Sequence, residues 1–138
     1  MPIIRSAPMT VIDSSSNGNH LSDFVVDQGA TSDWSYRKWN SGIAECWRNV
    51  SVNPTTVNGL NSVTVNLPFT FADTNFVVTA TPAKCGLLVD RYGDCATNNS
   101  MTHTTSSFIL SYNYAHGTIY TTSFNVMVKG RWKETYWR

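Results

Sequence analysis

The stretch that decides the fold is WSYRKWNSGIAECWRNVSV, residues 34–52. Bulky and polar residues alternate from Trp34 to Trp39, and a second strand-like run follows from Ile43 to Val52. Strict alternation of this kind is typical of a half-buried β-strand. The runs are separated by Asn40-Ser41-Gly42, which are residue types that favour tight turns. The stretch therefore predicts a β-hairpin.

The same period of two recurs on both sides of this hairpin. Further strands are predicted at residues 23–29, 63–67, 76–81 (closed by Pro82), 108–114 and 124–132, with a weaker candidate at 85–89 and the longest loop at 90–99. No window shows a sustained helical period of apolar residues, and no capping box precedes an apolar run. Short strands between turn residues predict an all-β fold, either an antiparallel β-sandwich or a partly closed barrel.

Length and composition limit the organisation and the partners. The chain has 138 residues, which fits one domain, and we expect an N-terminal arm or linker at 1–22 and the β-domain at 23–138. Charged residues make up 14% and the net charge is +1, without a basic stripe, so nucleic acid is not an expected partner. The apolar runs are too short for a membrane span, and residues 1–9 lack the apolar stretch of a secretory signal.

The cysteines number three and lack a CxxC spacing. Cys46 lies in a predicted strand and is interpreted as a small buried apolar residue. Cys85 and Cys95 flank a polar loop and could pair, but a chain of this size does not depend on a disulfide, so we expect free thiols.

The sequence contains few of the residue patterns that are typical of catalytic sites. His20, His103 and His116 are far apart and have no partner at metal-ligand spacing. Most acids are aspartates in turns, and Glu45, inside a strand, is expected to be a paired or solvent-facing residue rather than half of a glycosidase pair. No serine-nucleophile elbow or phosphate-binding loop is present. We therefore expect neither an enzyme nor a bound cofactor or metal.

Aromatic residues are the more informative group. We assign those of the hairpin and of the last strand to the core or to a subunit interface: Trp34, Tyr36, Trp39, Trp47 and Trp132. The tyrosines outside the hairpin are the better candidates for a binding surface: Tyr92, Tyr112, Tyr114 and Tyr120.

Residues 34–47 fit the pattern W-x-Y-x-K-W-x-S-G-x-A-E-C-W and resemble a segment of bacteriophage tail proteins, in which it opens the C-terminal tip domain of tail fibres. Residues 65–69, 76–82 and 126–133 resemble the "LP-x-x-F", following-strand and closing "G-R-W-K" segments of the same domains. The resemblance covers roughly residues 23–133 and implies a small β-sandwich, usually a homotrimer, that contacts host-surface glycans. Arg48 stands where that pattern often has glycine, and no catalytic residues are carried over.

The resulting hypothesis is a virion protein, at the tip of a tail fibre, that binds a receptor on the bacterial surface as a homotrimer. The candidate receptor contacts were chosen for their chemistry and expected loop position: Arg91, Tyr92, Asp94, Asn98, Asn99, His103, Tyr114 and His116. One alternative is a head-fibre, decoration or baseplate subunit anchored to other virion proteins by residues 1–22. Another is a glycan depolymerase.

Overall fold

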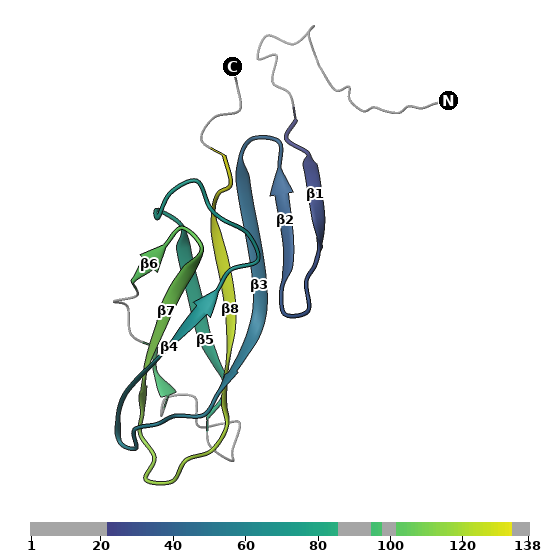
Figure 1. Ribbon diagram of the computed structural model, residues 1–138. Coiled ribbons are helices and arrows are strands. Elements are labelled where there is room, and N and C mark those ends of the chain that lie inside the picture. The colour runs from purple at the N-terminus through teal and green to yellow at the C-terminus, as the bar shows by residue number, and fades with distance from the viewer. Residues whose placement is uncertain (1–21, 86–94, 98–101, 134–138) are drawn as a thin grey trace, which may run out of the picture.

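The computed structural model describes residues 22–85, 95–97 and 102–133, and within them the chain forms two antiparallel β-sheets (Figure 1). The strands are β1 (Val25–Ala30), β2 (Ser35–Trp39), β3 (Ile43–Val52), β4 (Gly59–Asn66), β5 (Val77–Lys84), β6 (His103–Thr104), β7 (Ser107–Tyr114) and β8 (Thr122–Arg131). A five-stranded sheet has the order β1-β2-β3-β8-β5, and a three-stranded sheet has the order β4-β7-β6. The predicted antiparallel β-sandwich is confirmed, and the described strands do not close into a barrel. No helix in these ranges is long and apolar enough to cross a membrane.

The core lies between the two sheets and follows from the alternation of their strands. In β7, the buried positions are Phe108, Leu110, Tyr112 and Tyr114, while in β8 they are Thr122, Phe124, Val126 and Val128. Between these positions, β8 exposes Asn125, Met127 and Lys129. Because alternate side chains point to opposite faces of a strand, one face of each sheet builds the core and the other faces outward.

The hairpin of β2 and β3 forms where the sequence predicts it, and β3 has the predicted bounds. The turn requires a glycine, since Gly42 has φ +100°, a conformation that side-chain-bearing residues rarely adopt. Its amide donates to the Trp39 carbonyl oxygen at 3.0 Å. Asp23 holds the same turn from outside, because its carboxylate accepts hydrogen bonds from the amide and the hydroxyl of Ser41. The first described residues are thereby tied to the central hairpin.

Pro82 does not end its strand, so the predicted boundary is wrong. β5 continues to Lys84, and its register with β8 shifts between Pro82 and Lys84. β5 lies at the edge of the five-stranded sheet, where one side of the backbone has no partner strand. A proline is tolerated there because its missing N–H need not belong to the ladder.

Other details of the strands also differ from the sequence-based expectation. β4 begins at Gly59 rather than at Val63, and the two-residue strand β6 was not predicted. The weak strand candidate at 85–89 falls outside the described residues except for Cys85, which forms a bridge. The predicted arm at 1–22 also lies outside them except for Ser22.

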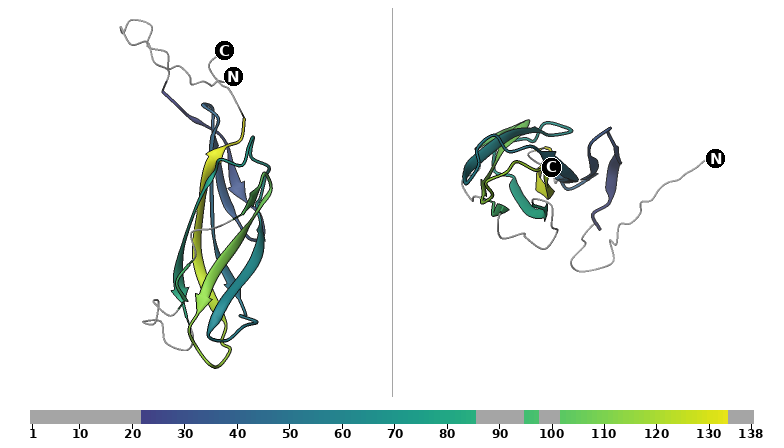
Figure 2. Two further views of the ribbon diagram at one scale, coloured as in Figure 1. Left: turned by 90° about the vertical axis from the view of Figure 1, so that its left-hand side faces the viewer. Right: turned by 90° about the horizontal axis from the view of Figure 1, so that it is seen from below.

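The five-stranded sheet is wider than the sheet that packs on it. The β1–β2 hairpin projects beyond the two-layer part, as Figure 1 and the right-hand view of Figure 2 show. β1 is exposed at every position except Val25, and two apolar side chains are exposed near its start, Phe24 (48%) just before the strand and Val26 (45%) within it. β2 is paired with β3, but β1 is an edge strand, so one side of its backbone has no partner strand in the described sheet. This margin is therefore one of the described surfaces that a further contact could cover.

Cys85 and Cys95 form a disulfide, so the expectation of free thiols is wrong. Both residues are fully buried, and their Cα atoms are 5.8 Å apart, which lies in the range that a disulfide can bridge. The sequence shows that the two cysteines flank a loop, but only the fold shows that they meet. The bond joins the end of β5 to residues 95–97, of which Thr97 pairs with Tyr112 of β7.

We expect the double variant Cys85→Ser/Cys95→Ser to lose about 2.5 kcal/mol of unfolding free energy, because a cross-link over a loop of this length restricts the unfolded chain. Urea unfolding with and without dithiothreitol measures the effect. The reductant should lower the midpoint of the unmodified chain and leave that of the double variant unchanged. A midpoint that is the same in all four samples would show that the bond contributes nothing.

Candidate functional site

The predicted receptor contacts are only partly within the described residues. Arg91, Tyr92, Asp94, Asn98 and Asn99 fall outside them. Of the remaining three, His103 lies in β6 and Tyr114 is the last residue of β7, so the prediction that both lie in loops is wrong. His116 lies in the connection between β7 and β8.

Tyr114 is fully buried and its phenol is used inside the protein. The Tyr114 hydroxyl donates to the Thr118 carbonyl oxygen at 2.6 Å and accepts from the Tyr120 amide at 2.9 Å. His116 packs beside it with 5.2 Å between the ring centroids. These contacts shape the β7–β8 connection and leave Tyr114 no surface for a ligand.

Tyr112 is a core residue as well. It is 2% exposed and packs on Phe124 of the facing sheet, with ring centroids 4.9 Å apart. The expectation that Tyr112 and Tyr114 belong to a binding surface is therefore corrected.

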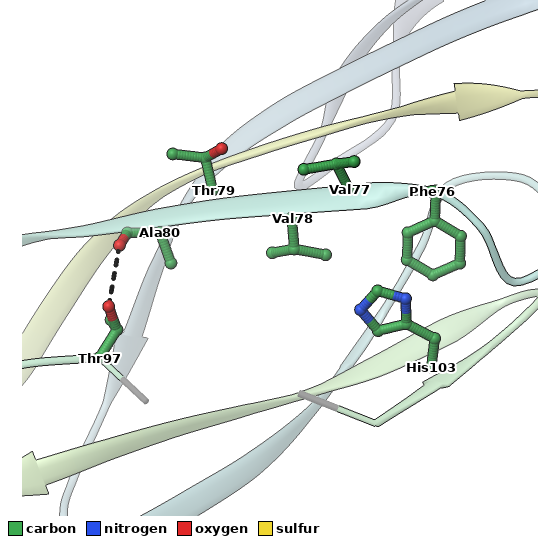
Figure 3. A pocket seen from close by; sticks show the side chains of 7 residues that line it. All are labelled: Phe76, Val77, Val78, Thr79, Ala80, Thr97 and His103. Carbon is green, nitrogen blue, oxygen red and sulfur yellow. Dashed lines mark hydrogen bonds between the residues drawn. The ribbon is translucent and has the colours of Figure 1, made fainter. Parts of the chain in front are cut away.

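His103 lines a hollow of about 420 Å³ at the open side of the sandwich, between β5 and β6 (Figure 3). Its ring stacks on Phe76 at 4.2 Å and 7°. The Nδ1 atom lies 3.2 Å from the Thr74 carbonyl oxygen, and since a carbonyl only accepts, Nδ1 is the donor of this contact.

The remaining lining of this hollow combines apolar side chains with two threonines. It consists of Phe76, Val77, Val78, Thr79, Ala80 and Thr97. The Thr97 hydroxyl donates to the Ala80 carbonyl oxygen at 3.3 Å, as Figure 3 shows. The lining residues include no carboxylate to act with the imidazole, so they form no acid–base pair.

The aromatic residues of the central hairpin divide between the two faces of its sheet. Trp34 is 4% exposed, and its Nε1–H donates to the Asn66 carbonyl oxygen of β4 at 2.9 Å, across the two layers. Tyr36 packs edge-on against Phe69 at 5.8 Å, and Trp132 donates to the Trp39 carbonyl oxygen at 2.9 Å. Tyr36 and Trp132 are partly buried against the core.

Trp39 and Trp47 are half-buried on the outward face of the same sheet. The Arg37 guanidinium lies 6.0 Å from the Trp39 ring centroid and 5.9 Å from that of Trp47. Arg37 also pairs with Glu45 at 3.7 Å, in agreement with the expectation of a paired strand residue there.

A second hollow, of about 560 Å³, lies on this outward face and was missed by sequence reasoning. It is lined by Trp47, Arg48, Asn49, Thr79, Thr81, Asn125, Val126 and Met127, which come from β3, β5 and β8. The alternation of each strand could have placed most of these side chains outward. It could not have shown that three strands distant in sequence become neighbours, nor that no described element covers them.

Within the described residues, the free cysteine and the possible metal ligands can be placed. No cluster of three or more metal-binding side chains occurs in the part of the chain that is described. Cys46 is fully buried, and burial raises the pKa of its thiol from 9.0 to about 12. The thiolate, which is the nucleophilic form, is thus disfavoured at neutral pH.

We expect the Cys46 thiol of the folded protein to resist a thiol reagent at pH 8 and to react after unfolding in urea. Because its pKa is raised on folding, the stability that the buried thiol contributes is present below pH 9 and is lost as the pH rises through about 12. Burial and the neighbouring Tyr114 raise the pKa of Tyr112 in the same direction. Comparing the pH dependence of the unfolding free energy of the unmodified chain with that of Cys46→Ala therefore isolates the contribution of this thiol. Rapid labelling of Cys46 without urea would contradict its burial.

No family model matches the sequence, and no curated protein matches it. Two solved structures share the fold. An N-truncated R1-type pyocin tail fiber matches with a TM-score of 0.56 and 14% identity, over 82% of this chain and 88% of that one. A P. aeruginosa R1 pyocin fiber fragment comprising C-terminal residues 323–701 matches with a TM-score of 0.55 and 13% identity, over 94% of this chain and 38% of that one. The described β-sandwich therefore has the fold of a domain found in pyocin tail fibers.

Proposed function

We propose that this chain is a structural module of a phage or phage-like particle, at the tip of a tail fibre, that attaches the particle to glycans on the bacterial surface. The observation that carries the proposal is the shared fold with a pyocin tail fiber over 82% of this chain and 88% of that structure. The phage-tail-like pattern at residues 34–47 supports it independently, because it depends on residue identities rather than on the backbone.

The module acts as a homotrimer in this proposal. Support comes from the exposed Phe24, just before β1, and Val26, within β1, because β1 is an edge strand of the larger sheet. Three copies around one axis would bury such surface, and three weak sites on one fibre would bind a cell with avidity.

The module binds and does not cleave. Glu45, the acid in a central strand, is paired with Arg37, and the Cys46 thiol is buried. A glycosidase would need two carboxyl groups facing one cleft. Asp23 and Glu45 line a third hollow, of about 270 Å³, but the Asp23 carboxylate accepts hydrogen bonds from Ser41 and Glu45 is paired with Arg37.

The test combines mass, attachment and product release on the full 138-residue chain. Light scattering should give about three times the chain mass of 15.4 kDa. The fluorescently labelled chain should bind a subset of bacterial strains, and mutants of those strains that lack surface polysaccharide should not retain it. Incubation with the purified polysaccharide should release no reducing ends.

Each alternative predicts a different result. Release of reducing ends would identify a depolymerase. Failure to bind any strain, together with loss of particle association when residues 1–22 are deleted, would identify a head-fibre, decoration or baseplate subunit. A monomer in light scattering would contradict the trimer.

A further inference from the structure

We propose that the groove on the outward face of β3, β8 and β5 is a binding site for a neutral oligosaccharide. The groove is the 560 Å³ hollow lined by Trp47, the two asparagines Asn49 and Asn125, Met127, and the two threonines Thr79 and Thr81. The inference deepens the proposed function and rests on it for its biological context, but the site is argued from side chains that the structure describes.

The strand register brings these side chains into two parallel rows. Trp47, Met127 and Thr79 stand opposite one another across β3, β8 and β5, and Asn49, Asn125 and Thr81 form the next row on the same face. Adjacent strands lie about 4.8 Å apart, so a row across them spans about 10 Å. This length suits a disaccharide unit lying across the strands.

The face is accessible because the second sheet packs on its opposite side. The residues that alternate with the rows, among them Cys46, Val126 and Ala80, are buried in the core. Met127, at the centre of the first row, is 50% exposed. The volume of the groove lies within the range of small-ligand sites.

The two rows offer complementary chemistry. The first presents the indole of Trp47 and the side chain of Met127, apolar surfaces on which the C–H face of a sugar ring packs. In the second, Asn49 Nδ2 donates to Asn125 Oδ1 at 3.1 Å. This bond leaves Asn49 Oδ1 as an acceptor and the Asn125 amide hydrogens as donors, a pair that matches a sugar hydroxyl, and the hydroxyls of Thr79 and Thr81 add to it.

The charges around the groove favour a neutral ligand. Arg48 is the charged residue of its lining, and its guanidinium packs 5.6 Å from the Trp34 ring centroid and 3.9 Å from Asp33 Oδ2. Arg37, next to Trp47, is paired with Glu45. An acidic sugar would meet no uncommitted cation in the described groove, whereas a neutral one requires none.

The mixed rows also argue against a second copy of the chain as the occupant. Interface cores between subunits are rich in aromatic and apolar residues, and here the aromatic and the methionine are surrounded by asparagine and threonine. The apolar margin at Phe24 and Val26 is at the other end of the sheet and is the better surface for self-association.

The experiment uses the full chain and a printed array of neutral and of uronic-acid-containing bacterial oligosaccharides. Neutral probes should be retained, and the affinity for the best of them, measured by calorimetry, should fall about tenfold or more in Trp47→Ala and in Asn125→Ala.

The matched controls remove the same groups from the outer face of the other sheet: Asn66→Ala for Asn125→Ala, and Thr64→Ala for Thr79→Ala. Near-ultraviolet circular dichroism confirms that each variant is folded, and Thr79→Ala/Thr81→Ala tests the groove if Trp47→Ala fails to fold.

The outcomes separate this site from the proposed function. Absence of neutral glycan binding, equal affinity of groove and control variants, or a change of oligomer mass in Asn125→Ala would each overturn the groove as a glycan site. If the groove variants still attach to cells like the unmodified chain, the proposed function stands and this inference fails. If neutral glycans bind through the groove but no strain is attached, the groove stands and the proposed function fails.

Discussion

Gly130→Ala is expected to lower the free energy of unfolding by about 3 kcal/mol. A Cβ at this position would lie 2.5 Å from Phe76 Cβ and about 3.0 Å from the Phe71 ring. Phe76 Cβ is attached to the backbone and cannot move away without shifting the chain. Gly130 pairs with Ala44, so two small residues form a shallow floor under the stacked rings of Phe71 and Phe76, whose centroids are 4.8 Å apart.

The matched control is Gly117→Ala. Its new Cβ would come no nearer than 3.7 Å to Asn58 Nδ2, so the stability should change by no more than about 0.5 kcal/mol. Urea unfolding of both variants followed by tryptophan fluorescence measures the difference. Equal midpoints for the two variants would show that the chain adjusts to a side chain at Gly130 and that the close approach is not required.

Phe124→Ala is expected to cost about 3–5 kcal/mol, because it removes a fully buried ring and leaves a cavity in a close-packed core. Phe124 lies in β8, which has β3 on one side and β5 on the other, and it reaches Tyr112 of the opposite sheet at 4.9 Å between ring centroids. The side chain therefore joins the two layers at the middle of the larger sheet.

Phe24→Ala is the control for this substitution, since the same side chain is 48% exposed just before β1. Its loss should cost less than about 1 kcal/mol. Thermal unfolding monitored by circular dichroism gives both values under one set of conditions. A smaller loss for Phe124→Ala than for Phe24→Ala would contradict the placement of the core between the sheets.

Much of the fold could be predicted because it depends on local sequence patterns. The alternation in residues 43–52 gave the bounds of β3, and Gly42 supplied a turn that only glycine adopts readily. The alternation of β7 also placed Tyr112 and Tyr114 on the same face as Phe108. Their burial was missed because phenols are also common on binding surfaces. What decides their place is the pair of hydrogen bonds at the Tyr114 hydroxyl, formed with a loop whose path the sequence does not show.

The disulfide and the outward groove could not be predicted for a different reason. The groove depends on contacts between strands that are far apart along the chain. The disulfide depends on the path of the loop between its two cysteines, which the sequence does not show. The groove needs β3, β8 and β5 to be neighbours, and the sequence shows each as a separate strand. The edge position that allows Pro82 within β5 is a property of the same arrangement.

The pairing of β3 with β8 has a consequence for synthesis. These strands, at residues 43–52 and 122–131, form the middle of the larger sheet, so the sheet cannot be completed until the ribosome has released the last strand. Until then, the early hairpin has an open edge and an uncovered apolar face, the features that expose a nascent chain to aggregation. Loop closure over so much of the chain also makes folding slow compared with helical domains of similar size. Early truncation of the open reading frame before β8 should therefore yield insoluble protein rather than a smaller folded domain.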